Sequence, residues 1–576
     1  MGQETGYCTL NPLGSAGTLS QGNLVQDGGA ATVYATSTMS FSSGKWYAEF
    51  DLGDHLYPGI GVCYEANPNA GWMATQAPYY FIYDNGSVLN NYPGGAEHFS
   101  PLPTTLFSPG MFQVALDVDN GKCWIGYENT WYTDQWATTA NPVTGFNATF
   151  PSLPSGKDWF FFLYSNDATW TANFGQKPLK YAPPEGFLPP NYANLSSPGV
   201  VRPAKFVTAT KWTSTGGSST YDVDCRLAPD LIWHKCYDGG QNNSVFTSIL
   251  PNSATDAGRL DTSGNSGGQT GWQAYFTGFT HNGYGISSTV SDLNPTAGAK
   301  MISYCWKAGG SKGTFNKDGI VYASAADAGL DGGSATPSAS SVGTKQGFSI
   351  IKVAGSNTAS KTFSHGLSQA PTFAIGKLLA VAPSNGLNQD WQVYHKVGMG
   401  NTKGLQLNLS TTEETSSALW NNTSPTDTLF SIGASTRWEG NFIMYLWHDV
   451  PGMQKFGTYD ANGSDTNGPF VYLGFRPAII MLMCYSGSGE NRYIYSDKAG
   501  EWQAQQANPN YSPSFLNDNA AANTSTTGYR VDFLSNGFRL RQANGPNTSS
   551  PASKYLYAAW AHQPMDNLYG AQSNAY

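Results

Sequence analysis

The stretch that decides the fold is Asp532-Phe-Leu-Ser-Asn-Gly-Phe-Arg-Leu-Arg541, followed by the apolar run Tyr555-Leu-Tyr-Ala-Ala-Trp560. The first part has the pattern of a strand, an Asn-Gly corner and a second strand. The same closing run occurs earlier as Met301-Ile-Ser-Tyr-Cys-Trp306 and as Phe442-Ile-Met-Tyr-Leu-Trp447. An ending that recurs in this way indicates one structural unit used three times.

Further landmarks recur in the same order before each closing tryptophan. A proline-led apolar run begins at Pro229, Pro371 and Pro477, at nearly equal distances from Trp306, Trp447 and Trp560. Further upstream, each copy has a phenylalanine-led run, and these runs begin at Phe206, Phe348 and Phe456. Because the period is far too long for a solenoid, we expect each copy to have a hydrophobic core of its own.

The composition favours an all-β protein. Charged residues make up 12% of the 576 residues, about half the ~25% typical of globular proteins, while aromatic residues reach 14% and glycines number 66. Disorder requires few aromatic residues and high net charge, so generic disorder is excluded. Alternating aromatic strands separated by Gly, Asn and Pro corners predict an all-β chain, and its length suits about four domains of roughly 150 residues.

Charge and cysteine usage exclude several classes of function. A net charge of −9 and a pI near 5.4 argue against binding to nucleic acid or to anionic membrane surfaces. The sequence has neither a long apolar run nor a basic-then-apolar leader, so we expect no membrane insertion and no ordinary signal peptide. Its 7 cysteines are scattered without a CxxC pair, which favours folding in a reducing cytoplasm and predicts no zinc site.

The first part of the chain reads as an antiparallel sandwich. Ser43-Gly-Lys-Trp-Tyr-Ala-Glu-Phe-Asp51 alternates apolar and polar residues, and Gly59-Ile-Gly-Val-Cys-Tyr64 is expected to pair with it. Met111–Val118 and Lys122–Tyr127 flank Asn120-Gly121, which predicts a hairpin with a type I′ turn.

These strands resemble the SPRY (B30.2) family, a concanavalin-like β-sandwich. The closing segments Trp170-Thr-Ala-Asn-Phe-Gly-Gln-Lys-Pro178 and Pro184-Glu-Gly-Phe187 match it as well. In place of the Asn-Gly of animal members, this chain has Tyr127-Glu-Asn-Thr-Trp-Tyr132, and the segment on to Asn147 is similar to versions found in bacteriophage tail proteins. The resemblance implies a binding scaffold without catalysis.

The repeats resemble an uncharacterised domain family in virion proteins of marine bacteriophages. The matching marks are Ala228-Pro-Asp-Leu-Ile-Trp-His-Lys235, Phe363-Ser-His-Gly-Leu-Ser-Gln-Ala-Pro371 and Gly468-Pro-Phe-Val-Tyr-Leu-Gly-Phe-Arg-Pro477. The order of modules is similar to that of a phage tail fibre. The expected domains are a SPRY-like sandwich at 1–188, a Pro-rich linker at 189–202, β-repeats at 203–310, 346–451 and 454–566, a Gly/Ala/Ser-rich linker at 311–345 and a polar tail at 567–576.

Motifs that suggest catalysis or metal binding have weak support. Gly264-Asn-Ser-Gly-Gly268 and Gly309-Gly-Ser-Lys-Gly313 mimic nucleophile loops but lie in polar loops without a strand-to-helix elbow. Asp117-x-Asp119-x-Gly121 suggests a calcium loop, yet Lys122 occupies the position that requires glycine. We expect His234 and His365 to be structural. The predictions are therefore no catalytic residue, no metal and no cofactor.

Aromatic residues in loops are the strongest candidates for a ligand-contacting surface. Trp131, Tyr132 and Trp136 lie in a polar connection after a hairpin, and Trp72 lies in another loop. Such rings can stack on sugars or anchor a protein partner. The alternative reading, which we weigh more heavily, is that they plug the ends of the sandwich.

Together these observations predict a non-enzymatic structural and adhesive component of a phage tail, a tail fibre that attaches to the virion and contacts a receptor or glycan on the host surface. It would be made in the bacterial cytoplasm, would bind other tail proteins, and would form a homotrimer by analogy with other fibres. A purely structural connector and a glycan-degrading tailspike are the alternatives. Paired carboxylates for a tailspike would have to come from residues such as Asp51, Asp54, Asp117, Asp119, Asp460 and Asp465.

Overall fold

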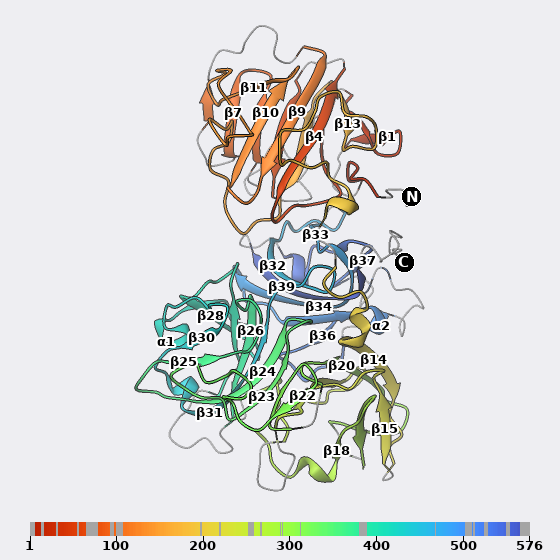
Figure 1. Ribbon diagram of the computed structural model, residues 1–576. Helices are drawn as coiled ribbons and strands as arrows, with labels where there is room; N and C mark the ends of the chain where they lie inside the picture. The colour runs from red at the N-terminus through yellow and green to blue at the C-terminus, as the bar shows by residue number, and fades with distance from the viewer. Residues whose placement is uncertain are drawn as a thin grey trace. The chain divides into compact units, whose positions relative to one another are not determined.

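The computed structural model describes residues 6–564 apart from 13–16, 30–32, 54–56, 65–78, 93–96, 100–107, 196–197, 218–219, 251–257, 265–267, 288–289, 291, 311–312, 380–388, 467, 501–507, 509, 511–512, 523–527 and 549–552. Strands dominate it, which confirms the all-β class (Figure 1). The chain divides into a compact N-terminal unit, mainly Met1–Ser197, and a compact C-terminal unit, mainly Pro198–Gly468 and Leu473–Met565. The helices in the described residues are short: α1 (Ser417–Trp420), α2 (Asp497–Gly500), η1 (Tyr192–Asn194), η2 (Pro203–Lys205), η3 (Trp272–Ala274), η4 (Thr436–Trp438) and η5 (Gly545–Asn547).

The N-terminal unit is an antiparallel sandwich, as the sequence predicts. In Figure 1 strands β4, β9 and β10 run side by side in one of its sheets, in agreement with their pairing. That sheet has the order β1 (Thr18–Ser20), β2 (Val25–Asp27), β13 (Thr169–Asn173), β4 (Lys45–Leu52), β9 (Gly110–Asp117), β10 (Lys122–Tyr127) and β11 (Thr130–Tyr132). The facing sheet has the order β3 (Val33–Thr36), β12 (Phe160–Ser165), β5 (Gly59–Cys63), β6 (Tyr79–Tyr83), β7 (Ser87–Tyr92) and β8 (Glu97–Phe99).

The alternation of β4 explains how the sandwich closes. Trp46, Ala48, Phe50 and Leu52 are buried in the core between the sheets. Tyr47 points to the opposite face, where it packs in a separate buried cluster with residues such as Phe187. Successive residues of a strand face opposite sides, so β4 is buried on both sides although its sequence alternates.

The predicted β9–β10 hairpin is confirmed, but its turn type is wrong. Gly121 has a φ of +62°, whereas Asn120 is absent from the residues with positive φ, so the loop is not a type I′ turn. The Asp117 Oδ1 accepts a hydrogen bond from the Asn120 N–H at 3.1 Å, which favours a longer loop with a single left-handed residue. The residues with positive φ at both central positions are Glu128 and Asn129, between β10 and β11.

The three repeats have the same strand order in their main sheets. The order is β14 (Val207–Thr213), β20 (Lys300–Trp306), β16 (Leu231–Cys236) and β17 (Ser244–Thr247) in repeat 1. It is β24 (Phe348–Gly355), β31 (Gly440–Trp447), β26 (Phe373–Leu378) and β27 (Gln392–His395) in repeat 2. It is β32 (Gln454–Asp460), β39 (Lys554–Pro564), β34 (Phe475–Ser486) and β35 (Arg492–Ser496) in repeat 3.

The register confirms that the closing tryptophans are equivalent. Trp306, Trp447 and Trp560 lie opposite Leu231, Phe373 and Ile479, each of which follows the landmark proline of its repeat by two positions. On the other side, the tryptophans lie opposite Val207, Phe348 and Gln454. The upstream phenylalanines are therefore shifted slightly from true equivalence in repeats 1 and 3.

Each main sheet is accompanied by a smaller set of strands. Repeat 1 adds β15 (Tyr221–Asp224), β19 (Gly283–Ile286) and β18 (Phe276–Phe279), and repeat 2 adds β25 (Lys361–Ser364) and β30 (Leu429–Ile432). Repeat 3 adds β37 (Val531–Leu534) and β38 (Gly537–Leu540), with β33 (Phe470–Tyr472) before β34 in the chain. Further short strands are β28 (Lys403–Gln406), β29 (Glu414–Thr415) and β36 (Ser514–Phe515).

Repeats 1 and 2 each have a buried cluster of their own, as expected, but the three repeats also share a core, which the sequence did not predict. One buried cluster contains Ile302, Tyr304 and Trp306 of repeat 1 together with their counterparts in repeats 2 and 3. The Trp560 ring centroid lies 5.3 Å from that of Trp306 and 5.8 Å from that of Trp447. Alternating residues of the same strands, such as Met301 and Cys305, instead pack toward the smaller sheet. The main sheets are buried on both faces, so the repeats form one unit.

Equivalent residues of the three repeats also reach across their boundaries. Asn243, Trp391 and Arg492 are equivalent, because each lies two positions before the residue that pairs with Trp233, Ile375 or Met481 in its main sheet. The residues that accept their hydrogen bonds are equivalent as well. Asp261, Gln406 and Phe515 each directly follow the residue that pairs with Val245, Val393 or Ile494.

The three bonds form a closed cycle, which we call the inter-repeat ring. Asn243 Nδ2 donates to the Phe515 carbonyl at 3.1 Å, from repeat 1 to repeat 3. Arg492 Nε donates to the Gln406 carbonyl at 3.3 Å, from repeat 3 to repeat 2. Trp391 Nε1 donates to the Asp261 carbonyl at 2.8 Å, from repeat 2 back to repeat 1. The C-terminal unit therefore has pseudo-threefold symmetry within one chain.

The predicted linkers are folded where the structure describes them. In 311–345, β21 (Phe315–Lys317), β22 (Ile320–Tyr322) and β23 (Ala339–Gly343) extend the sheet of repeat 2, and Leu330 is buried. In 189–202, Val200 is 1% exposed and joins the shared core. Small residues such as Ala and Ser allow close packing. The segment 311–345 is therefore ordered where the structure describes it, although its composition is typical of a flexible linker.

We expect the C-terminal unit to unfold as one cooperative unit. Trp391→Phe removes one indole hydrogen bond of the inter-repeat ring and leaves the Asp261 carbonyl without this donor. It should lower the free energy of unfolding by about 1–3 kcal/mol. Amide hydrogen exchange should accelerate together in β20, β31 and β39. Trp124→Phe, which removes the bond from Trp124 Nε1 to the Phe146 carbonyl in the N-terminal unit, is the matched control and should leave those strands unchanged. Faster exchange confined to repeat 2 would contradict a shared core.

Candidate functional site

The aromatic residues predicted to contact a ligand are mostly built into the sandwich. Tyr132 is 8% exposed and Trp136 is 6% exposed, and their ring centroids lie 6.4 Å apart. Trp131 is half-buried in β11 and meets Tyr47 edge to face at 6.5 Å. Tyr132 and Trp136 therefore belong to the core between the sheets, whereas Trp131 packs on the outer face of the sheet with Tyr47. Trp72 lies outside the described residues.

The chain that follows β11 is held in place by side-chain hydrogen bonds. Thr133 Oγ1 accepts from the backbone N–H groups of Gln135 and Ala137, each at 3.1 Å. The Thr149 hydroxyl donates to the Tyr132 carbonyl at 2.5 Å and accepts from the Ile125 N–H at 2.9 Å. Threonine side chains thereby replace a strand ladder, and the loop has a fixed shape without regular secondary structure.

This loop forms a cleft of about 410 Å³ on the N-terminal unit. Gln135, Thr139 and Asn147 are exposed and Asp134 is half-buried, so hydrogen-bonding groups form part of its wall, beside apolar surface of similar extent. The lining residues are Lys122, Thr133, Asp134, Gln135, Ala137, Thr139, Asn147, Ala148 and Pro151. We refer to this feature as the loop cleft.

Part of the polar lining of the loop cleft is already oriented. Lys122 Nζ donates to the Gly145 carbonyl at 2.8 Å, and Asn147 Nδ2 donates to Thr139 Oγ1 at 3.1 Å. Between Gly145 and Asn147, the Phe146 side chain is 58% exposed. Phe146 directly precedes Asn147, which lines the loop cleft. Phe146 is not among the residues predicted to contact a ligand, although it is an aromatic residue in the same loop.

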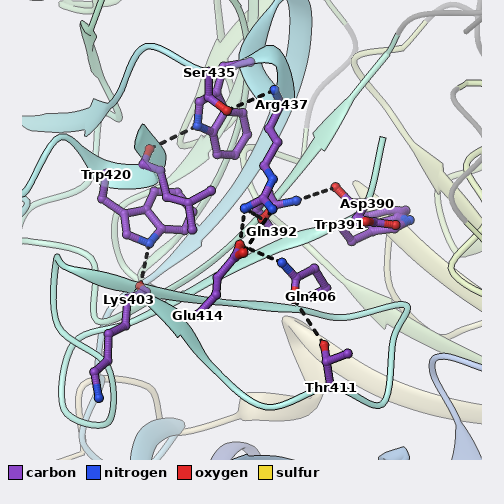
Figure 2. Close-up of polar contacts among 12 residues, drawn as sticks. Asp390, Trp391, Gln392, Lys403, Gln406, Thr411, Glu414, Trp420, Ser435 and Arg437 are labelled. Atoms are coloured by element: carbon purple, nitrogen blue, oxygen red, sulfur yellow. Dashed lines mark hydrogen bonds and ion pairs between the residues drawn. The ribbon is translucent and has the colours of Figure 1, made fainter. Parts of the chain in front are cut away.

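A second polar cluster, in repeat 2, is a structural brace. Figure 2 shows Arg437 of η4 and Gln406 of β28 pointing toward Glu414 of β29. Arg437 Nη2 donates to Glu414 Oε2 at 3.1 Å, Arg437 Nη1 donates to Oε1, and Gln406 Nε2 also donates to Oε1, at 2.6 Å. The bidentate pairing fixes the plane of both groups. Glu414 is thus engaged by two partners and is not presented to a ligand.

A serine, a histidine and a tyrosine meet in repeat 1, but inside the core. His234 Nδ1 lies 3.0 Å from the Tyr284 hydroxyl and 3.3 Å from Ser303 Oγ, and the two hydroxyls are 2.7 Å apart. All three residues are fully buried. A nucleophile must reach its substrate, so this group satisfies buried polar atoms and does not form a hydrolytic site.

Two of the other candidates for chemistry, Asp117 and Asp460, lie in ion pairs within the described residues. Asp117 is 1% exposed, with Lys45 Nζ 3.1 Å from its Oδ2, and Asp460 Oδ2 lies 3.7 Å from Lys554 Nζ. The serines of both nucleophile-like loops, Ser266 and Ser311, and also Asp54 lie outside the described residues. Within the described parts of the chain, no group of His, Cys, Asp and Glu residues is arranged to hold a metal ion. No helix in those parts is long and apolar enough to cross a membrane.

Comparison with known proteins gives a family for the C-terminal unit. A family model described as "Domain of unknown function (DUF7483)" matches residues 202–564. No curated protein matches the chain in sequence.

Solved structures give partial matches. The SPRY domain of human HERC1 matches with 11% identity and a TM-score of 0.22, covering 29% of this chain and 99% of that one. The TRIM65 PSpry domain matches with 15% identity and a TM-score of 0.19, covering 29% and 92%. Stonustoxin matches with 15% identity and a TM-score of 0.20, covering 29% of this chain and 27% of that one.

The buried histidines predict acid sensitivity. Burial lowers the pKa of His234 to about 3 and those of His365 and His395 to about 4. The folded pKa lies below the ordinary value of 6.5, so the stability that these groups contribute is fully present above pH 6.5. It is lost as the pH falls toward the folded pKa, because the unfolded chain binds the protons first.

We therefore expect the free energy of unfolding to decrease by about 2 kcal/mol per buried histidine between pH 7 and pH 5. Urea titrations at the two pH values measure it. His281→Gln, at an exposed histidine, is the control and should show the same pH dependence as the unmodified chain. Equal stability at both pH values would show that the buried rings do not remain neutral.

Proposed function

The chain belongs to the DUF7483 family over residues 202–564, and from that premise we propose that it is a non-catalytic structural and adhesive component of a bacteriophage tail. In this proposal it attaches to the virion as part of a tail fibre and contacts the surface of the host cell. It is made in the cytoplasm of the host bacterium. Its partners are other tail proteins and further copies of itself in a trimeric fibre.

The adhesive role rests on the loop cleft and on the exposed ring of Phe146, which directly precedes the lining residue Asn147 in the sequence. Gln135, Thr139 and Asn147 offer amide and hydroxyl groups, which are the partners that sugar hydroxyls use. The exposed Phe146 ring supplies an apolar face for the C–H side of a pyranose. A concave surface of mixed polarity, with an exposed aromatic ring close by in the sequence, suits a neutral glycan.

The position of the loop cleft also favours recognition. The loop is fixed by Thr133 and Thr149 on an antiparallel sandwich, and binding residues are often found on loops held by a rigid scaffold. Little conformational entropy would be lost when a ligand settles there. Several such sites on one particle would add avidity to weak single contacts.

The lining favours binding over cleavage. Asp134 is the carboxylate among the described lining residues, whereas glycoside hydrolysis commonly uses a pair of carboxylates on either side of the bond. Glu413 and Glu414 in repeat 2 are held by Lys403 and Arg437. Non-catalytic adhesion is therefore the function that these contacts support best.

We predict that Phe146→Ala weakens binding of the purified chain to surface polysaccharide of the host by at least about tenfold, the effect of ~1.4 kcal/mol. Gln135→Ala should weaken it less, by the loss of one hydrogen bond. Ile320→Ala removes an equally exposed side chain from the C-terminal unit, where Ile320 is 57% exposed, and serves as the control. Surface plasmon resonance measures the affinities. Unchanged binding by Phe146→Ala would remove the loop cleft from the proposal.

We also predict that the same polysaccharide keeps its size distribution after incubation with the protein. Size-exclusion chromatography with light scattering measures this distribution. If the polysaccharide is shortened and Asp134→Asn abolishes the shortening, the glycan-degrading tailspike is favoured instead. If the protein neither shortens nor binds the polysaccharide, a purely structural connector is favoured.

A further inference from the structure

Two cysteines of repeat 1 lie in contact although the sequence gives no sign that they pair. Cys225 directly follows β15, and Cys305 lies in β20, which belongs to the main sheet. Their Sγ atoms are 3.2 Å apart, and both residues are 0% exposed. They lie in the buried cluster between the main sheet and the β15–β19–β18 sheet.

The contact is closer than ordinary packing requires. A disulfide bond has an S–S distance of about 2.05 Å, so the sulfurs must approach by only about 1 Å to bond. The backbone at Cys225 is already held near the main sheet, because the Thr208 hydroxyl of β14 donates to the Cys225 carbonyl at 3.1 Å. Both side chains therefore point at one another from strands whose spacing is set by other contacts.

We propose that Cys225 and Cys305 are an oxidisable pair, which a peroxide converts into a disulfide that links the smaller sheet of repeat 1 to its main sheet. The site is reduced in the cytoplasm and oxidised outside the cell. The pairing of the two cysteines rests on the contact between their sulfurs, whereas the change of compartment rests on the proposed function.

The chemistry needs one oxidant and balances without a metal. Burial raises the pKa of the Cys305 thiol, so the attacking thiolate forms when β15 opens to water. The thiolate attacks a peroxide oxygen, the O–O bond breaks and a sulfenic acid forms, while the other oxygen takes up the proton released by the thiol and leaves as water. The second thiol then attacks the sulfenic sulfur, the S–S bond forms, and the hydroxyl leaves as a second water. The two cysteines together lose two electrons and two protons, and the peroxide is reduced.

The position of Cys225 gives a small oxidant a route to the sulfur. Among the described strands β15 forms an edge of its sheet, pairing with β19 through Tyr221–Asp224. Asp222 and Asp224 of this strand are exposed. Short edge strands open locally at a fraction of the cost of global unfolding, so β15 can admit peroxide without disturbing the shared core.

The bond would stabilise the unit chiefly through the unfolded chain. It joins residues far apart in the sequence and closes a long loop, which restricts the unfolded ensemble. A peripheral sheet that opens easily would then be fastened to a main sheet that forms part of the shared core. The effect suits a protein made in a reducing compartment and used in an oxidising one.

The test begins with the full chain purified in a reductant, desalted, and treated with hydrogen peroxide at increasing concentration. Free thiols are counted after denaturation, and digested peptides are identified by mass spectrometry. We expect the count to fall by two from the 7 cysteines, with a linked peptide that contains Cys225 and Cys305 and weighs two hydrogen atoms less than its reduced parts. The midpoint of thermal unfolding should rise on oxidation.

Cys305→Ser should lose both the linked peptide and the rise in the unfolding midpoint. Cys236→Ser changes another buried cysteine of repeat 1, whose Sγ lies 3.8 Å from Asp238 Oδ1, and should keep both. If a serine variant fails to fold, the peptide map of the unmodified chain still decides the matter. Seven free thiols at every dose that leaves the chain folded, oxidation of both cysteines without a linked peptide, or a disulfide between other cysteines would overturn the proposal.

Discussion

The inter-repeat ring is the constraint on which the C-terminal unit depends. Each of its bonds is donated by the same strand position and accepted by the same neighbouring carbonyl, and the three bonds close around one chain. All are buried, so each unpaired carbonyl would retain a desolvation cost. The same unit contains an aromatic core in which Trp560 contacts Trp306 and Trp447. No repeat can bury its inner face without the other two.

The ring also shows how the repeats diverged while keeping one geometry. An amide, an indole and a guanidinium occupy its donor position, and they share only an N–H that reaches the adjacent backbone. A neighbouring position shows the same tolerance: Lys235 and Lys377 are buried where repeat 3 has Met483. Burial lowers the pKa of Lys235 to about 8 and that of Lys377 to about 7, so these ammonium groups approach the neutral form that a core tolerates. Contacts between repeats therefore restrict where donor and acceptor atoms lie more than they restrict which residue types supply them.

The proposed binding surface follows a different physical rule. In the N-terminal unit the strands of the sandwich form the core, and Tyr132 and Trp136 are buried in it. The groups left for a ligand come from the irregular chain after β11, which threonine hydroxyls hold in shape. Phe146 remains exposed because its neighbours satisfy the backbone around it, with the Trp124 indole donating to its carbonyl. The scaffold and the recognition surface can therefore vary independently.

The sequence by itself determined the all-β class, the three repeats and the equivalence of their prolines and closing tryptophans, because alternation and spacing are local properties of a strand. It also identified the hairpin around Gly121, but not its turn, which a side chain of Asp117 decides. Only the tertiary structure decided that the repeats share a core, that 311–345 covers a sheet, and that Phe146 is exposed while Trp136 is buried. These outcomes depend on which apolar faces meet and which contacts join residues far apart in the chain. A strand that is buried on both faces and one that is buried on a single face can have the same sequence pattern.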